Sequence, residues 1–157
     1  MDSIQETWSP DAIRAIIHAH AAHEGPLLPI LHAIQAAYGY VPPEAERLIA
    51  EALNLSRADV HGVVSFYHDF RHAPAGRHVL KLCRAEACQS MGGEAQARHL
   101  LESLGLEWGG TTADGRLTVE AVYCLGLCAT APAALLDETP CGRLDEAALQ
   151  ALVAEVA

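Results

Sequence analysis

The chain has 157 residues, of which 51% are hydrophobic, so it is long enough to bury one core or two small ones. Ten basic against twenty acidic residues give a formal net charge of -10, which repels the phosphates of nucleic acids and of anionic lipids. The composition is typical of a globular protein and argues against nucleic acid or a membrane surface as a partner. The acidity either keeps a small domain soluble or helps it to dock onto a basic partner face.

Residues 1–6 have neither the basic start nor the apolar centre of a secretory signal, and no apolar run reaches the length needed to cross a bilayer. We therefore expect no membrane insertion and a cytoplasmic, reducing location. In such a location clustered cysteines are more often metal ligands than disulfides.

The first half of the chain has the apolar spacing of amphipathic helices, with capping and helix-breaking residues between them. Four helices are expected before a linker at residues 73–76, so we predict a helical lobe over residues 1–76. The residues that mark the helix boundaries, in chain order, are Ser9, Pro10 and Asp11; Leu28 or Pro29 and Gly39; Pro42, Pro43, Glu44 and Asn54; and Ser56, Asp59 and Tyr67.

Residues 77–157 alternate between strand-like and helix-like patterns and are predicted to form a second domain. The expected order is strand, helix, two strands joined by a hairpin turn at Asp114 and Gly115, a further strand, a turn through Pro140 and Gly142, and a final helix from Asp145. A βαβ start followed by a ββα finish indicates an α+β fold. The expected strands cover residues 78–83, 106–111, 116–123 and 133–137, and the first helix covers about 92–104.

Two pairs of cysteines follow two of the predicted strands. Cys83 ends the first strand and precedes Cys88, and Cys124 follows a later strand and precedes Cys128, so the spacings are Cys-x4-Cys and Cys-x3-Cys. If these strands lie side by side, the four thiolates face one space. Soft thiolate ligands in that number select zinc or an iron-sulfur cluster.

The spacing leaves three alternatives open. Structural zinc sites favour tight Cys-x-x-Cys turns, which this chain lacks, whereas wider and unequal loops suit a 2Fe-2S cluster with one thiolate pair on each iron. Structural disulfides are the third alternative. Thiol-disulfide exchange is disfavoured, because it needs two closely spaced cysteines at the start of a helix.

The cysteine pattern resembles that of a known family. Cys83-x4-Cys88 and, after 35 residues, Cys124-x3-Cys128 are similar to the thioredoxin-like 2Fe-2S subunit of respiratory complex I, NAD-reducing hydrogenases and NAD-dependent formate dehydrogenases. Residues 54–67 resemble a second hallmark of that family. The run Cys-Arg-Ala-Glu-Ala-Cys-Gln-Ser from Cys83 is most similar to the gamma subunit of molybdenum- or tungsten-dependent formate dehydrogenase.

The resemblance implies a thioredoxin-like fold for residues 77–157 and one 2Fe-2S cluster held by Cys83, Cys88, Cys124 and Cys128. It further implies an electron-transfer role beside a subunit that binds FMN and NAD, with a formate-oxidising molybdenum or tungsten subunit beyond it. Those cofactors are expected only on the partners, because the chain has no phosphate loop or dinucleotide fingerprint of its own. The alternatives are the equivalent subunit of a hydrogenase or complex I, or a zinc-stabilised interaction module.

Several residues near the cysteines are candidates for tuning such a site. Two ferric ions, two sulfides and four thiolates sum to a charge of about -2, which backbone N–H groups must stabilise. Gly126, Gly92 and Gly93 would let the chain point amides at sulfur, or would serve only as turn formers. Arg84 would add positive charge beside the cluster, or would simply be exposed.

The remaining cysteine and the histidine clusters are expected to have no part in the site. Cys141 lies in a predicted turn and matches no ligand motif, so it is interpreted as a bystander that would oxidise if exposed. The histidines are interpreted as solvated or satisfied by local contacts. They form two groups, His18, His20 and His23 in the first helix, and His68 and His72 at the end of the fourth.

Overall fold

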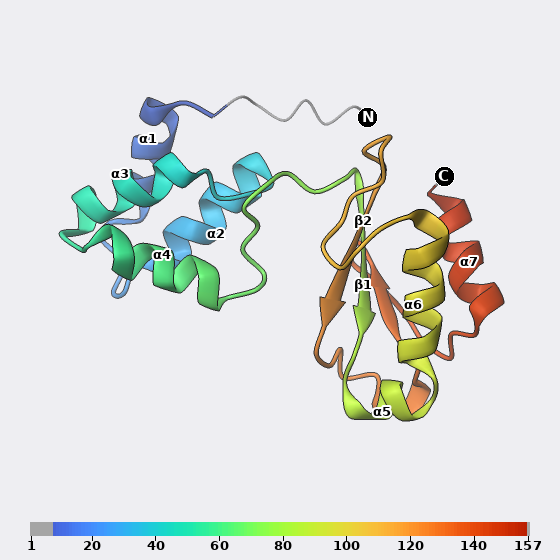
Figure 1. Cartoon of the computed structure of the whole chain (residues 1–157). Helices are drawn as coiled ribbons and strands as arrows, with labels where there is room; N and C mark the ends of the chain where they lie inside the picture. Colours follow the sequence, from blue (N-terminus) through green and yellow to red (C-terminus); the bar gives the residue numbers. More distant parts are fainter. Residues whose placement is uncertain (1–7, 157) are drawn as a thin grey trace. The chain divides into compact units, whose positions relative to one another are not determined.

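The computed structural model describes residues 8–156, and residues 1–7, for which no secretory signal is expected, lie outside this range together with residue 157. Contacts divide the chain into two compact units, Met1–Pro74 and Ala75–Ala157, whose elements Figure 1 shows. Each unit has its own hydrophobic core. The division falls inside the expected linker at residues 73–76. The assignment of residues 1–76 and 77–157 as separate domains stays a prediction.

Within residues 8–74 the chain forms four helices, as expected. Their shared core is largely aliphatic, with Ile13, Ile30 and Ile49 completely buried. The first-unit helices are α1 (Pro10–His20), α2 (Leu27–Tyr38), α3 (Pro43–Leu53) and α4 (Arg57–Phe66).

The helix ends follow from the capping residues. The Ser9 side chain accepts a hydrogen bond from the Ala12 N–H at the start of α1, and Ser56 and Asp59 form a capping box at the start of α4. Gly39 and Asn54 end α2 and α3 in left-handed conformations, with φ of 78° and 53°. All of these boundaries were expected from the sequence. No helix in the described part of the chain is long and apolar enough to span a bilayer.

Residues 75–156 form a four-stranded sheet in the order β2-β1-β3-β4, with three helices and one short 3-10 helix. β1 and β2 run parallel, and β1 pairs antiparallel with β3. The strands are β1 (His78–Cys83), β2 (Leu117–Val122), β3 (Ala134–Leu136) and β4 (Thr139–Cys141); the helices are α5 (Glu86–Ser90), α6 (Gly93–Leu104), η1 (Cys128–Thr130) and α7 (Glu146–Glu155).

One core joins the sheet to α6 and α7. Leu80 and Leu82 of β1 point to the same face and pack in a single cluster with Leu101 of α6 and Leu149 of α7. Figure 1 shows both helices beside the sheet, while α5 lies at the end where β1 finishes. Sheet and helices together confirm the predicted α+β class.

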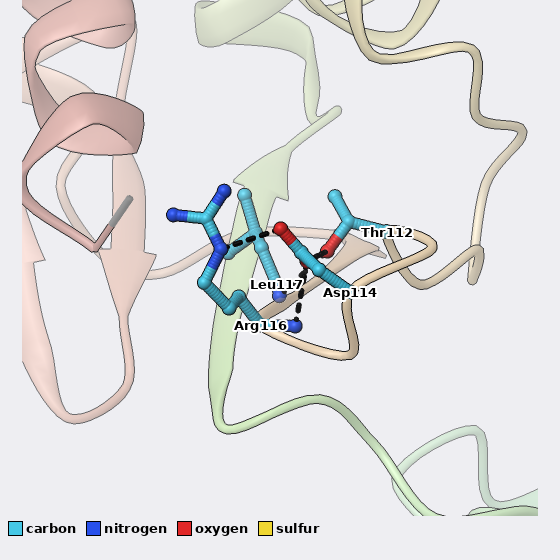
Figure 2. Close-up of polar contacts among 4 residues, drawn as sticks. All are labelled: Thr112, Asp114, Arg116 and Leu117. Atoms are coloured by element: carbon cyan, nitrogen blue, oxygen red, sulfur yellow. Dashed lines mark hydrogen bonds and ion pairs between the residues drawn. The ribbon is translucent and has the colours of Figure 1, made fainter.

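A hairpin at Asp114 and Gly115 brings the chain into β2, as expected. The Asp114 carboxylate accepts hydrogen bonds from the Thr112 hydroxyl (2.7 Å), the Arg116 backbone N–H (3.1 Å) and the Arg116 guanidinium. The Leu117 N–H in turn donates to the Thr112 hydroxyl oxygen at 3.1 Å (Figure 2). These contacts fix the residue at which β2 begins. Because the second cysteine pair follows the other end of β2, they also help to fix the position of that pair.

The prediction of a strand at residues 106–111 is wrong. The Gly110 N–H donates to the Glu107 carbonyl at 2.9 Å in a tight turn, and Gly109 has a φ of 80°. The end of the segment still pairs with β2, because Thr111 lies opposite Thr118 and the Gly109 N–H donates to the Val119 carbonyl at 2.8 Å. Two consecutive glycines let the chain turn where the apolar pattern alone indicated a strand.

The expected turn through Pro140 is also wrong, because Thr139–Cys141 forms the edge strand β4. The turn lies earlier, at Asp137, which has a φ of 53°. An edge position tolerates Pro140, since its missing N–H is not needed by a further strand. The strand predicted at residues 133–137 is confirmed as β3.

Candidate metal centre

The first cysteine pair lies at the end of β1 in a buried position. Cys83 is the last residue of the strand and Cys88 lies in α5, and their exposed fractions are 7% and 2%. The Cys83 N–H donates to the Ala133 carbonyl at 3.1 Å, which ties the strand end to the segment before β3.

α5 was not expected, because five residues are too few to show helical periodicity. The Gln89 side chain closes the turn by donating to the Arg84 carbonyl at 2.7 Å, and the Gln89 N–H donates to the Ala85 carbonyl at 3.0 Å. Gly93, the first residue of α6, packs directly on this helix: a Cβ there would lie 2.7 Å from the Cys88 carbonyl oxygen. The turn of α5 that carries Cys88 therefore packs closely against the first residue of α6.

The second pair lies at the end of β2 and is exposed. Cys124 adopts a φ of 93°, and Cys128 begins η1, which brings the two sulfur atoms to 3.7 Å. The Gly126 N–H is directed at the Cys124 sulfur at 3.4 Å, which confirms that this glycine points an amide at sulfur. Gly92 does not, because its N–H donates to the Gln89 carbonyl.

The parallel pairing of β1 with β2 brings the two pairs together. Cys83 lies opposite Val122 in the register, two residues before Cys124. The Cys83 sulfur accepts hydrogen bonds from the backbone N–H groups of Cys124 and Leu125 as well as from its own loop, and it interacts electrostatically with Cys128. The structure therefore gathers the four predicted thiols at one end of the sheet.

The thiols alter one another's acidity. Burial raises the pKa of Cys83, but hydrogen bonds from backbone N–H groups and from the Cys88 thiol outweigh it, so the net pKa is lowered. Burial and the neighbouring Cys83 raise the pKa of Cys88, and contact with Cys124 raises that of Cys128. Four thiolates so close together repel unless a cation neutralises them.

An all-sulfur donor set fits zinc or an iron-sulfur cluster by its softness. Among residues 8–156, no three His, Cys, Asp or Glu side chains surround a single ion position. Two thiol pairs from two loops fit a 2Fe-2S cluster, with one pair for each iron, better than a single tetrahedral ion. The assignment of Cys83, Cys88, Cys124 and Cys128 as ligands stays a prediction.

Arg84 is neither simply exposed nor an unpaired positive charge. Its guanidinium donates to both carboxylate oxygens of Glu94 at the start of α6 and lies over the Trp108 ring, 4.8 Å from the ring centroid. Nothing in the sequence pattern indicated this arrangement, because Glu94 and Trp108 lie 10 and 24 positions beyond Arg84 and each residue type is common on surfaces.

Cys141 and His20 each contact a nearby backbone carbonyl. The Cys141 thiol lies on β4 and approaches the Thr139 carbonyl at 3.6 Å, while the His20 ring contacts the Ile16 carbonyl at 2.9 Å. The sequence also missed a contact in the first unit, between the carboxylate of buried Glu46 and the His61 ring at 3.2 Å.

Two known redox subunits are similar to this chain over most of its length. The chain is 33% identical over 132 residues to the NADP-reducing hydrogenase subunit HndA of Solidesulfovibrio fructosivorans, a match that covers 84% of this chain and 77% of that protein. It is 32% identical over 142 residues to the NADH-quinone oxidoreductase subunit 2 of Thermus thermophilus, with 88% of this chain and 73% of that protein covered.

A solved structure gives the same result for the fold. The crystal structure of an NAD+-reducing [NiFe]-hydrogenase in the H2-reduced state matches with a TM-score of 0.65 and 31% identity, over 80% of this chain and 22% of that one. The present chain thus corresponds to about a fifth of that chain's length. Residues 13–157 match the sequence model of a single family, and the chain belongs to it: the thioredoxin-like [2Fe-2S] ferredoxins.

Proposed function

We propose that this chain is the electron-transfer subunit of an NAD-dependent formate dehydrogenase, with one 2Fe-2S cluster bound by Cys83, Cys88, Cys124 and Cys128. The observation that carries the proposal is the convergence of two thiol pairs from parallel strands at one end of the sheet. Family membership supports the cluster type. A cytoplasmic location is part of the same proposal.

The protein groups around the thiols suit an anionic cluster. A bound 2Fe-2S cluster supplies a one-electron redox couple and, with four thiolates, has no open position for a substrate. The backbone N–H groups of Ala85, Cys124 and Leu125 point at the Cys83 sulfur, and that of Gly126 points at Cys124. Their role is to stabilise negative charge that grows when the electron arrives.

The partner would be a subunit that binds FMN and NAD and exchanges single electrons with this chain. The similar NAD+-reducing hydrogenase structure and the relative named as an NADH-quinone oxidoreductase subunit support an NAD-linked complex. The run from Cys83 to Ser90 is the observation that favours formate dehydrogenase, with its molybdenum or tungsten subunit, over the equivalent subunits of hydrogenase or complex I.

A partner would approach the cluster from the surface where the second cysteine pair is exposed. Cys124 and Cys128 are exposed, whereas Cys83 and Cys88 are buried. Tyr123, next to Cys124, is 69% exposed, and large exposed side chains of this kind are common where proteins dock. We expect the flavin subunit to contact this end of the second unit, with the helical unit adding contact area.

The cluster is tested by measuring iron and acid-labile sulfide in anaerobically purified protein, with an EPR spectrum after dithionite reduction. About two irons and two sulfides per chain, with one spin-half signal, are expected for a 2Fe-2S cluster. Zinc without sulfide would replace this account with a structural metal domain.

The complex is tested by purifying the tagged chain from its host. A formate-oxidising subunit and a flavoprotein should accompany it, and the isolated complex should reduce NAD with formate. Recovery of hydrogenase or quinone-reductase subunits instead would keep the electron-transfer role and reject formate dehydrogenase.

A further inference from the structure

Arg84 directly follows Cys83 and is held more firmly than a surface arginine. Its Nε donates to Glu94 Oε2 at 3.1 Å and its Nη2 to Glu94 Oε1 at 2.9 Å, which is a two-bond fork between planar groups. The Arg84 side chain is only 27% exposed. The fork anchors the first cysteine loop to the beginning of α6.

The same guanidinium reaches two further segments. It lies over the ring of Trp108, in the turn that precedes the hairpin, and it interacts with the phenol of Tyr123, the residue before Cys124. One side chain therefore touches α6, the 107–110 turn and the start of the second cysteine loop.

The Arg84 backbone is fixed as well. Its N–H donates to the Val122 carbonyl at 2.8 Å, which continues the pairing of β1 with β2 beyond the strand end, and its carbonyl accepts from the Gln89 side chain at 2.7 Å. Arg84 is thus bonded on one side to the strand that leads to Cys124 and on the other to the helix that contains Cys88.

The site needs such a support, because its thiols come from loops and a five-residue helix rather than from long rigid elements. A cluster imposes fixed sulfur positions, and ligands on loops hold them less accurately than ligands supported by neighbouring side chains. Lysine would not replace arginine here, since an ammonium group cannot form the two-bond fork or stack on the indole in the same way.

We propose that Arg84 is a positioning residue that locks the first and second thiol pairs at the spacing of a 2Fe-2S cluster, with Glu94 and Trp108 fixing its side chain. This inference rests on the proposed function. The Arg84–Glu94 pair also sets opposite charges beside the cluster, so removing one partner leaves the other uncompensated.

The test compares Arg84→Lys, Arg84→Gln and Glu94→Gln with the wild type and with Arg98→Gln, which removes an exposed positive charge one turn further along α6. The readouts are the half-life of the cluster under a chelator, the EPR line shape and the midpoint potential. We expect the three variants at Arg84 and Glu94 to lose the cluster about tenfold faster than wild type, with broadened EPR lines. Arg98→Gln should match wild type.

The midpoint potential distinguishes a charge effect of the Arg84–Glu94 ion pair from a general loss of rigidity in the cysteine loops. Arg84→Gln should lower the potential, because an unpaired carboxylate disfavours reduction, and Glu94→Gln should raise it, because the guanidinium charge is then uncompensated. Shifts of the same sign, wild-type behaviour of Arg84→Lys, or Arg84 and Glu94 variants that resemble Arg98→Gln would each overturn the inference. If the wild type itself contains no iron and sulfide, it is the proposed function that fails.

Discussion

Cys124 combines an unfavourable backbone conformation with a predicted ligand role. Its φ of 93° lies in the region that favours glycine, at a cost of about 1–3 kcal/mol for other residues. The thiol side chain is nevertheless present, and its sulfur accepts the Gly126 N–H. Strain of this kind concentrates at functional sites, which agrees with the proposed cluster.

Replacing Cys124 should therefore separate folding from cluster binding. We expect Cys124→Gly to make the metal-free protein about 1 kcal/mol more stable than Cys124→Ser, because glycine accepts a positive φ. Neither variant should retain a complete cluster. Denaturant unfolding measures the first effect and iron content the second, and equal stability of the two variants would show that the backbone strain is not relieved.

Asp114 makes a pH-dependent contribution to stability through the hairpin shown in Figure 2. Hydrogen bonds from the Thr112 hydroxyl and from Arg116 hold its pKa well below the ordinary value of 3.8. A carboxylate with a lowered folded-state pKa stabilises the fold above its unfolded pKa and loses that effect as pH falls.

The wild type should consequently lose more stability than Asp114→Asn when the pH is lowered from 5 to about 2, since the amide does not titrate in this range. Denaturant midpoints of both proteins at several pH values measure the difference. Parallel curves for the two proteins would contradict the assigned role of the Asp114 hydrogen bonds.

At the scale of elements, the α5–α6 junction leaves no room for a side chain. A Cβ on Gly93 would lie 2.7 Å from the Cys88 carbonyl oxygen, so Gly93→Ala must push the two helices apart. We expect a loss of about 1–3 kcal/mol in the free energy of unfolding and faster cluster loss.

Gly62 provides the matched control, because it lies inside α4, is exposed, and an added Cβ would meet nothing within 4 Å beyond the backbone of its own helix. Gly62→Ala should raise the free energy of unfolding by about 0.5–1 kcal/mol. Thermal or denaturant unfolding of both variants measures the contrast, and a stabilised Gly93→Ala variant would disprove the close packing.

The sequence predicts best where a local chemical rule acts. Capping residues located the helix ends of the first unit, and strand patterns located β1, β2 and β3. Prediction failed where the pattern was too short or where another strand decides: α5 has only five residues, and β4 exists because β3 offers it a partner. The apolar pattern of 106–111 was overridden by the turn at Gly109 and Gly110.

In the candidate site, too, some features could be predicted from the sequence and others could not. Spacing and strand ends indicated which four thiols would meet, because parallel strands carry their ends to one edge. They could not indicate that the first pair is buried and the second exposed, nor that Arg84 binds Glu94 and Trp108, since these depend on how α6 and the 107–110 turn pack.

At the scale of the whole molecule, all four predicted ligands belong to the unit Ala75–Ala157, which has its own core. We expect residues 75–157, produced alone, to fold and to incorporate iron and sulfide, as circular dichroism and metal analysis would show. The matched fragment 1–74 should be helical and bind no iron. A fragment 75–157 that stays unfolded would mean that the two units form one cooperative domain.

The in-register pairing of β1 with β2 also determines where this chain tolerates changes of length. One residue inserted between Leu117 and Cys124 would move the second thiol pair by about 3.3 Å along the strand and turn alternate side chains to the opposite face. Natural variation in length should therefore be rare between Leu117 and Cys124. A tag or a spectroscopic probe is better inserted in the turn between α1 and α2, at residues 21–26, because this turn belongs to the other unit and carries none of the predicted ligands.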